Sequence, residues 1–244
     1  MRRLFSLTVR NTKEILRDPL TVCFSLGFPL VLLLLMSAIQ ASIPVSLFEI
    51  EHLTPGITVF GLSFMTLFTA TLIAKDRESA LLQRLYTTPL KSSDYIFAYA
   101  LPILPIAIAQ CAICYLVALL LGLTPSVQIL YAILSIVPSA LLFIGMGLLF
   151  GSVLGVKQVG GICGALLTNL SAWLSGVWFD LTLVGGVFER IAGLLPFVHA
   201  VELARGALNG ENEGMPGHLL WVLGYAAAIM ALAVALFLRQ MKKQ

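Results

Sequence analysis

The sequence predicts an all-α integral membrane protein with six transmembrane helices, and composition is the first reason. Of its 244 residues, 59% are hydrophobic and 11% are charged, whereas about a quarter of the residues in a soluble domain are charged. A water-soluble core of this size would not bury so much apolar surface, so lipid must be part of the solvent. The second reason is that the chain holds six apolar runs free of Asp, Glu, Lys and Arg.

Each run is long enough to cross a bilayer, which takes roughly 20 residues of helix. Backbone groups in hydrocarbon must hydrogen-bond within the segment, which favours helices, and the alternation typical of a β-barrel is absent from the sequence. We expect one transmembrane domain over residues 1–244. The six expected spans are residues 20–40, 55–74, 95–121, 128–151, 160–179 and 218–238.

Residues 1–18 precede the first span and are predicted to form an interfacial helix. Its apolar side chains are expected to face lipid, and its charged side chains water; a plain basic anchor is the alternative. The apolar set is Leu4, Leu7, Ile15 and Leu16, and the charged set is Arg3, Arg10, Lys13, Glu14 and Arg17. The charged stretch is too long, and the apolar run after it too extended, for a cleaved signal peptide.

The basic residues indicate the orientation. All Lys and Arg except Arg190 and Arg205 flank the spans on the side of both termini. The positive-inside rule therefore predicts that both termini are cytoplasmic. The formal net charge of +3 is explained by this topology, so we expect no nucleic-acid partner.

Small residues inside the spans are expected to serve packing. Cys111 and Cys114 resemble half of a zinc or redox motif, but no second pair completes it, so buried thiols are favoured. Repeated G-x-x-x-G spacing allows helix backbones to approach closely, either within one chain or between two. The glycines concerned are Gly147, Gly151, Gly155, Gly160 and Gly164.

An intramembrane serine protease is an alternative of a different class. Ser175 and Gly176 form a Ser-Gly pair, yet Trp173 stands where the nucleophile motif would have glycine. The candidate base, His199, lies outside the spans, and a serine nucleophile needs its base within hydrogen-bonding reach. This function is therefore disfavoured.

The spans also lack the ionisable residues with which ion-coupled carriers bind ions or protons. The sequence contains no G-x-x-x-x-G-K-[ST] motif for a nucleotide. We expect no cofactor in this chain, and any energy for transport must come from another polypeptide.

The loop after the second span is the most patterned polar segment. Residues 76–89 are predicted to form a short helix, because Leu81, Leu82 and Leu85 recur at helical spacing and Pro89 is a good helix stop. A helix this short needs a surface to pack against. Lipid headgroups and a protein partner are equally good candidates on physical grounds.

The run Glu78-Ser79-Ala80-Leu81-Leu82-Gln83-Arg84-Leu85, followed by Thr87-Thr88-Pro89-Leu90, resembles the signature loop of ABC type-2 exporter permeases. Ala80, Leu81 and Gln83 depart from the residues frequent there. The resemblance implies a coupling helix that fits a groove of a separate P-loop ATPase subunit, which would bind the ATP and Mg²⁺. The coupling residues it implies are Glu78, Leu81, Leu82, Arg84, Leu85 and Pro89.

Two stripes of polar residues are candidates for a substrate pathway, since polar groups in spans usually face inward. The alternative is that their hydroxyls bond only to their own backbone. The stripe on span 2 is Ser63, Thr66 and Thr69. The stripe on span 5 is Thr168, Asn169, Ser171, Trp173 and Ser175. Hydroxyls and aromatic rings without charge would suit an amphipathic or lipid-like molecule.

Residues 180–217 are predicted to be an external re-entrant segment, because their apolar pieces of about ten residues are too short to span. The resemblance extends to Pro196-Phe197-Val198-His199-Ala200-Val201-Glu202-Leu203-Ala204-Arg205 and implies an outer gate there. Its candidate residues are Pro196, Glu202 and Arg205. A solvated cap is the alternative.

With these observations, the resemblance implies the permease subunit of an ATP-driven exporter in a bacterial-type cytoplasmic membrane, of the multidrug or natural-product efflux kind. It would act with an ATP-binding subunit, membrane lipid and a second permease, as a homodimer or with a sibling. The rival hypothesis is a passive or structural membrane protein whose loop helix lies on lipid.

Overall fold

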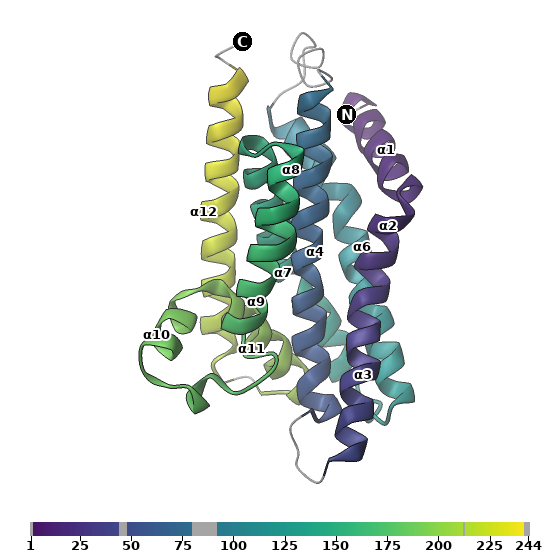
Figure 1. Ribbon diagram of the computed structural model, residues 1–244, viewed down its shortest axis with the longest axis vertical. Coiled ribbons are helices and arrows are strands. Elements are labelled where there is room, and N and C mark those ends of the chain that lie inside the picture. The colour runs from purple at the N-terminus through teal and green to yellow at the C-terminus, as the bar shows by residue number, and fades with distance from the viewer. Residues whose placement is uncertain (1, 44–47, 80–91, 212, 242–244) are drawn as a thin grey trace.

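The computed structural model describes residues 2–43, 48–79, 92–211 and 213–241, and within these ranges the chain is helical with no strand. The expected all-α fold is confirmed. The long helices run along a common direction and form one bundle, whereas α10 and α11 lie at one end of it (Figure 1). They are α1 (Arg2–Arg17), α2 (Pro19–Val22), η1 (Cys23–Gly27), α3 (Phe28–Ser42), α4 (Ile50–Glu78), α6 (Ser92–Leu120), α7 (Gln128–Val153), α8 (Val156–Val159), η2 (Gly160–Leu167), α9 (Thr168–Leu174), η3 (Leu181–Leu183), α10 (Gly186–Leu194), α11 (Pro196–Asn209) and α12 (Met215–Met241).

Five helical segments of the described chain are long and apolar enough to cross a membrane, or six if a bent pair counts as one span. The pair is α10 with α11, which are bent by 77° at their junction. The five segments are Pro19–Ser42, Ile50–Glu78, Asp94–Leu120, Gln128–Val153 and Met215–Phe237.

The predicted span at residues 160–179 takes a different form. A helical run from Val156 to Leu174 occupies this place, and its middle, η2, is a π-helix. It is not among the five segments above. The helix stops before Phe179, where the prediction placed its end, because Gly176 has a φ of 70° and turns the chain. The predicted boundary is therefore wrong at this end.

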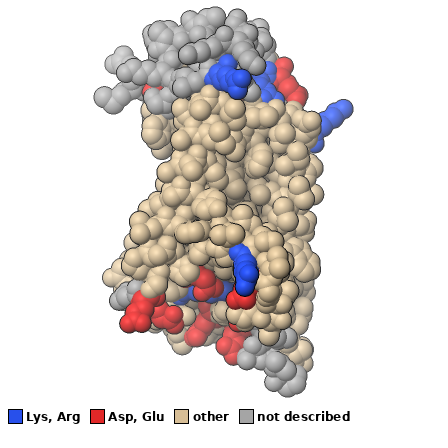
Figure 2. Space-filling model, turned by 90° about the vertical axis from the view of Figure 1, so that its left-hand side faces the viewer, with Lys and Arg blue, Asp and Glu red and all other residues tan. Residues whose placement is uncertain are grey.

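Charged residues are confined to the two ends of the bundle. Figure 2 shows a band without charge between an end where Lys and Arg gather and an end where Asp and Glu prevail. The N- and C-termini lie at one end, and α10 and α11 lie at the other (Figure 1). This arrangement fits a chain whose middle is solvated by lipid.

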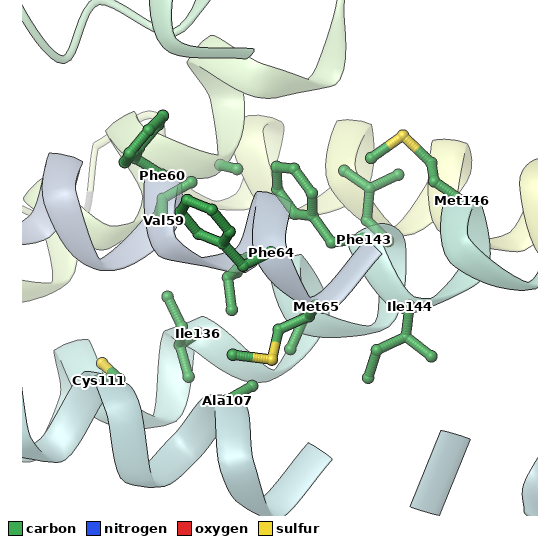
Figure 3. Close-up of a cluster of buried hydrophobic side chains, with 14 of the residues drawn as sticks. Val59, Phe60, Phe64, Met65, Ala107, Cys111, Ile136, Phe143, Ile144 and Met146 are labelled. Atoms are coloured by element: carbon green, nitrogen blue, oxygen red, sulfur yellow. The ribbon is translucent and has the colours of Figure 1, made fainter. Parts of the chain in front are cut away.

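Helix α4 is the central element of the bundle and is buried along most of its length. Its side chain Met65 points toward Ala107 of α6 and Ile136 of α7 (Figure 3). Phe64 points to another side of α4, where its ring lies 5.2 Å from that of Phe28 on α3. Helices α4, α6 and α7 share one continuous hydrophobic core. Motion of α4 would therefore have to move its neighbours, because a close-packed core has no free volume to absorb a displacement.

Glycines bring α4 and α7 into direct backbone contact. A Cβ placed on Gly147 would lie 2.5 Å from the Cβ of Thr69, and one on Gly151 would lie 2.8 Å from the carbonyl oxygen of Ala70. The first G-x-x-x-G unit thus packs within one chain. In the second unit, Gly164 lies beside Leu67, whereas Gly160 faces open space.

The N-terminal helix differs from its prediction. Leu7 and Ile15 are buried against the protein, where α1 contacts α6, and do not face lipid. Phe5 and Leu16 are the exposed apolar side chains of this helix. The apolar face of an amphipathic helix can pack against lipid or against protein. In α1 most of this face is buried against the protein.

Gly147 generates a test of the α4–α7 contact. Gly147→Ala should destabilise the protein by about 1–3 kcal/mol, because the new methyl group overpacks the contact with Thr69. Thermal unfolding in detergent measures this. Gly224→Ala on α12 is the matched control: nothing lies within 4 Å of its Cβ position. Equal unfolding temperatures for the two variants would contradict the close contact.

Candidate functional site

The carboxylate of Asp76, near the end of α4, joins three helices. Its exposed side-chain fraction is 2%. Arg10 of α1 donates two hydrogen bonds, from Nη1 to Oδ2 at 2.5 Å and from Nη2 to Oδ1 at 2.7 Å. Tyr99 of α6 donates its hydroxyl proton to Oδ2 at 2.7 Å. A bidentate, charge-assisted pair of this kind fixes both distance and orientation.

Neighbouring groups complete this junction. Burial disfavours the charge of Arg10, but its hydrogen bond with Asp76 and the charge of Asp76 outweigh this and raise the pKa of Arg10. Asn11 is fully buried, accepts from Arg10 at 3.0 Å and donates to the carbonyl oxygen of Ala98 at 3.0 Å. Helix α1 is therefore held on both α4 and α6 by polar bonds as well as by packing.

Arg77 and Glu78, which follow Asp76 in the sequence, bind the turn between α7 and α8. Arg77 donates to the carbonyl oxygens of Ser152 and, at 2.6 Å, Leu154. These bonds satisfy carbonyl groups at the end of α7 that have no partner inside the helix. Glu78 accepts from the backbone N–H of Val156, the first residue of α8, at 2.9 Å. Three consecutive charged residues thus attach the end of α4 to α1, α6, α7 and α8.

The sequence interpretation missed most of this junction. It placed Arg10 in water and did not single out Asp76 or Tyr99. A signal was present, since four consecutive charged residues, 75–78, follow directly on a long apolar run. Glu78, expected on a separate helix over residues 76–89, is the last residue of α4. The other predicted coupling residues lie outside the described residues: Leu81, Leu82, Arg84, Leu85 and Pro89.

The polar stripe of span 2 lies inside the bundle. Ser63, Thr66 and Thr69 are all fully buried. Thr66 donates across the interface to the carbonyl oxygen of Phe143 on α7 at 2.7 Å, and Thr69 donates to its own helix at Met65, at 2.6 Å. In this conformation Thr66 and Thr69 lie at the contact between α4 and α7, and the role of the stripe in a substrate pathway stays a prediction.

The stripe of span 5 divides into two faces. Thr168, Ser171 and Ser175 are buried, and each donates to a carbonyl oxygen of its own helical segment. Asn169 is exposed, and 56% of Trp173 is exposed. Only these last two residues of the stripe are presented on the outer surface of the chain.

At the end opposite the termini, Arg205 connects three parts of the chain. Although only 7% exposed, it donates from Nη1 to Glu202 at 2.8 Å and from Nη2 to the carbonyl oxygen of Gly176 at 2.9 Å. Its Nε donates to the carbonyl oxygen of His52 on α4 at 3.4 Å. Pro196 is buried at the start of α11. The guanidinium group therefore holds α11 against the turn after α9 and the beginning of α4.

A cavity of about 430 Å³ lies beside Arg205. His199 borders it and bonds through Nε2 to the carbonyl oxygen of Gly193 at 2.9 Å and through Nδ1 to Nδ1 of His218 at 2.8 Å. Since a carbonyl only accepts, a neutral His199 carries its proton on Nε2 and accepts from His218. On the cavity rim, the backbone N–H of Thr182 lowers the pKa of Asp180.

The geometry does not assemble a serine nucleophile. Ser175 donates to the carbonyl oxygen of Ala172, and His199 is bonded to His218 and Gly193. Within the described ranges, no group of three or more His, Cys, Asp or Glu side chains could hold a metal ion. Cys111, Cys114 and Cys163 are buried free thiols, whereas Cys23 is exposed.

Arg205 yields a direct test of the outer junction. Arg205→Lys should destabilise the protein by about 1–3 kcal/mol, because a single ammonium group cannot replace the bonds to His52, Gly176 and Glu202 and leaves a buried carbonyl unsatisfied. The thermal unfolding midpoint in detergent measures the loss. Arg190→Lys, at an exposed position on α10, is the control; a midpoint for Arg205→Lys as high as that of the control would contradict the bridging role.

Comparison with known proteins agrees with the helical architecture. Residues 2–209 match the model of a protein family described as ABC-2 type transporter. No curated protein matches the sequence. The family match covers well over half of the 244 residues and includes both the Asp76 junction and Arg205. The chain therefore belongs to the ABC-2 type transporter family and is a multi-pass membrane permease subunit.

Proposed function

We propose that the chain is the transmembrane half of an ATP-driven exporter and takes its energy from a separate P-loop ATPase that binds ATP and Mg²⁺. The ATPase would dock on the predicted coupling segment, residues 76–89, through Glu78, Leu81, Leu82, Arg84, Leu85 and Pro89. In this account both termini are cytoplasmic and the permease pairs with a second copy or a sibling.

The observation that carries this proposal is the placement of the Asp76 junction. Asp76, Arg77 and Glu78 lie at the start of the proposed docking segment and bind α1, α6 and the α7–α8 turn. A displacement of the segment would pull on α4, and α4 would carry its partners with it.

The other end of α4 provides a route to the outer gate. His52 is bonded to Arg205, so α4 connects the proposed dock with the junction that holds α11. We assign the gate to Pro196, Glu202 and Arg205. Transmission requires a rigid element with two discrete arrangements, and the buried, closely packed α4 is the best candidate in the described chain.

For the substrate pathway we retain the exposed residues of the span 5 stripe, Asn169 and Trp173. Their helix presents leucines beside them, including Leu166 and Leu170. An aromatic ring and an amide among leucines suit an amphipathic or lipid-like molecule, because such a surface offers hydrogen bonding and apolar contact but no charge for an ion. In the dimer this face would meet the partner permease.

Docking is tested by purifying the tagged chain from its host in mild detergent and measuring co-purified ATPase. The combined change Arg84→Glu and Leu85→Asp should reduce the recovered ATPase by about tenfold or more, because losing a buried charged contact costs about 2–5 kcal/mol. Mass spectrometry and ATP hydrolysis identify the partner. The matched control, Arg190→Glu with Ile191→Asp, makes the same changes at exposed positions on α10. If no ATPase is recovered with the folded wild type, the proposal is contradicted.

Transmission is tested on the same complex with Arg77→Met. This change removes the bonds to Ser152 and Leu154 and should weaken coupling between the two ends by about 0.5–2 kcal/mol. The readout is maleimide labelling of Glu189→Cys on α10, in a background without native cysteines, with and without a non-hydrolysable ATP analogue. We expect the nucleotide-dependent change in labelling to shrink while the ATPase still binds.

The control is Lys157→Met, an exposed cation on α8, which should keep the full nucleotide-dependent change. An undiminished change in Arg77→Met would show that the signal does not pass through the α7–α8 turn.

A further inference from the structure

A cleft of about 710 Å³ lies between α1 and the end of α4, on the side of the bundle that carries the termini. Neither the gate nor the candidate substrate pathway includes it. Its lining is polar and charged, and it comes from the N-terminal helix, the start of the first span and the end of α4. The lining residues are Ser6, Val9, Arg10, Lys13, Glu14, Arg17, Asp18, Pro19 and Lys75.

The charges of this cleft do not cancel. The guanidinium group of Arg10 forms ion pairs with Asp76 on α4 and, at 2.5 Å, with Glu14 on its own helix. Asp18 caps the backbone N–H of Thr21 and lies 4.0 Å from Lys75, at the limit of an ion pair.

Two further cations, Lys13 and Arg17, are exposed. Neither takes part in an ion pair within the described ranges. The cleft thus presents Lys13 and Arg17, which have no ion pair within the described ranges, and Lys75, whose contact with Asp18 is at the limit of an ion pair.

The cleft also lies where the chain passes from polar to apolar surroundings. Helix α1 ends at Arg17, and the first span begins at Pro19. Three large apolar side chains of α1 and α2 are exposed: Phe5 by 71%, Leu16 by 61% and Leu20 by 68%. A ligand with an anionic head and apolar tails would match both surfaces, whereas a soluble anion would match only the cations.

We infer that this cleft binds the phosphate headgroup of an anionic phospholipid, with Lys13, Arg17 and Lys75 contacting the phosphate and the acyl chains lying along Leu16 and Leu20. Basic residues at the end of a span and on an amphipathic helix attract anionic lipids. Arg10 borders the cleft, and its ion pair with Asp76 joins α1 to α4 beside the bound phosphate. A bound headgroup would therefore hold α1 against α4. The inference requires only that the chain spans a membrane and is independent of the proposed ATPase partner.

Native mass spectrometry of the purified chain tests this, with phosphatidylglycerol or phosphatidylcholine added in equal amounts. The wild type should retain phosphatidylglycerol in preference to phosphatidylcholine. Replacing Lys13, Arg17 and Lys75 by Gln should lower the retained phosphatidylglycerol about tenfold or more, because each cation near the membrane surface contributes to the attraction. Lys13→Gln alone should cause a smaller loss.

The matched control replaces three exposed cations elsewhere, Lys157, Arg190 and Arg239, by Gln and should keep the wild-type preference. Two results would overturn the inference: a wild type without preference, or a cleft variant that retains as much phosphatidylglycerol as the control. Displacement of the lipid by equimolar glycerol 3-phosphate would also overturn it and identify a site for soluble phosphates, whereas persistence of the lipid supports the membrane source.

Discussion

The buried carboxylate of Asp76 is the interaction on which the bundle's charged end depends. A carboxylate removed from water is costly unless charge and hydrogen bonds compensate it. Arg10 supplies two bonds and the opposite charge, and Tyr99 supplies a third bond. Removing Arg10 would leave the buried carboxylate without a compensating charge, so α1, α4 and α6 are held together at this point. The rest of α4 is fixed by close packing against α7.

Both ends of α4 are held by polar bonds to neighbouring segments. At one end, ion pairs and bonds to free carbonyl groups bind Asp76, Arg77 and Glu78 to neighbouring helices. At the other, Arg205 bonds to the carbonyl oxygen of His52 and to Glu202. Between them, α4 contributes no charged side chain to the apolar middle of the bundle. A closely packed apolar helix with polar bonds at both ends is suited to transmitting a displacement across a membrane. The proposed ATP-driven mechanism requires such transmission.

The class of the fold and the cores of most spans could be predicted from sequence, because the cost of placing charge in lipid acts on each segment separately. The helix ends were less predictable: α4 extends to Glu78, since its last charged residues find partners on α1 and on the α7–α8 turn. The pairing of Arg10 with Asp76 depends on how distant segments pack, and the pattern of one segment contains no such information. For the same reason the contact of Thr66 and Thr69 with α7 could not be predicted from the spacing of the stripe.

The most direct test of the Asp76 junction is a double-mutant cycle with Arg10→Ala, Asp76→Ala and the double variant, measured as the free energy of unfolding in mixed detergent micelles. The account predicts that Arg10→Ala destabilises the protein by about 3–5 kcal/mol, as expected when the partner of a buried charge is removed. Asp76→Ala should cost less, because Arg10 is 38% exposed and also pairs with Glu14. The account also predicts a double variant far less destabilised than the sum of the two single changes, with an interaction energy of about 2 kcal/mol or more. Additive effects, within about 0.5 kcal/mol, would contradict it.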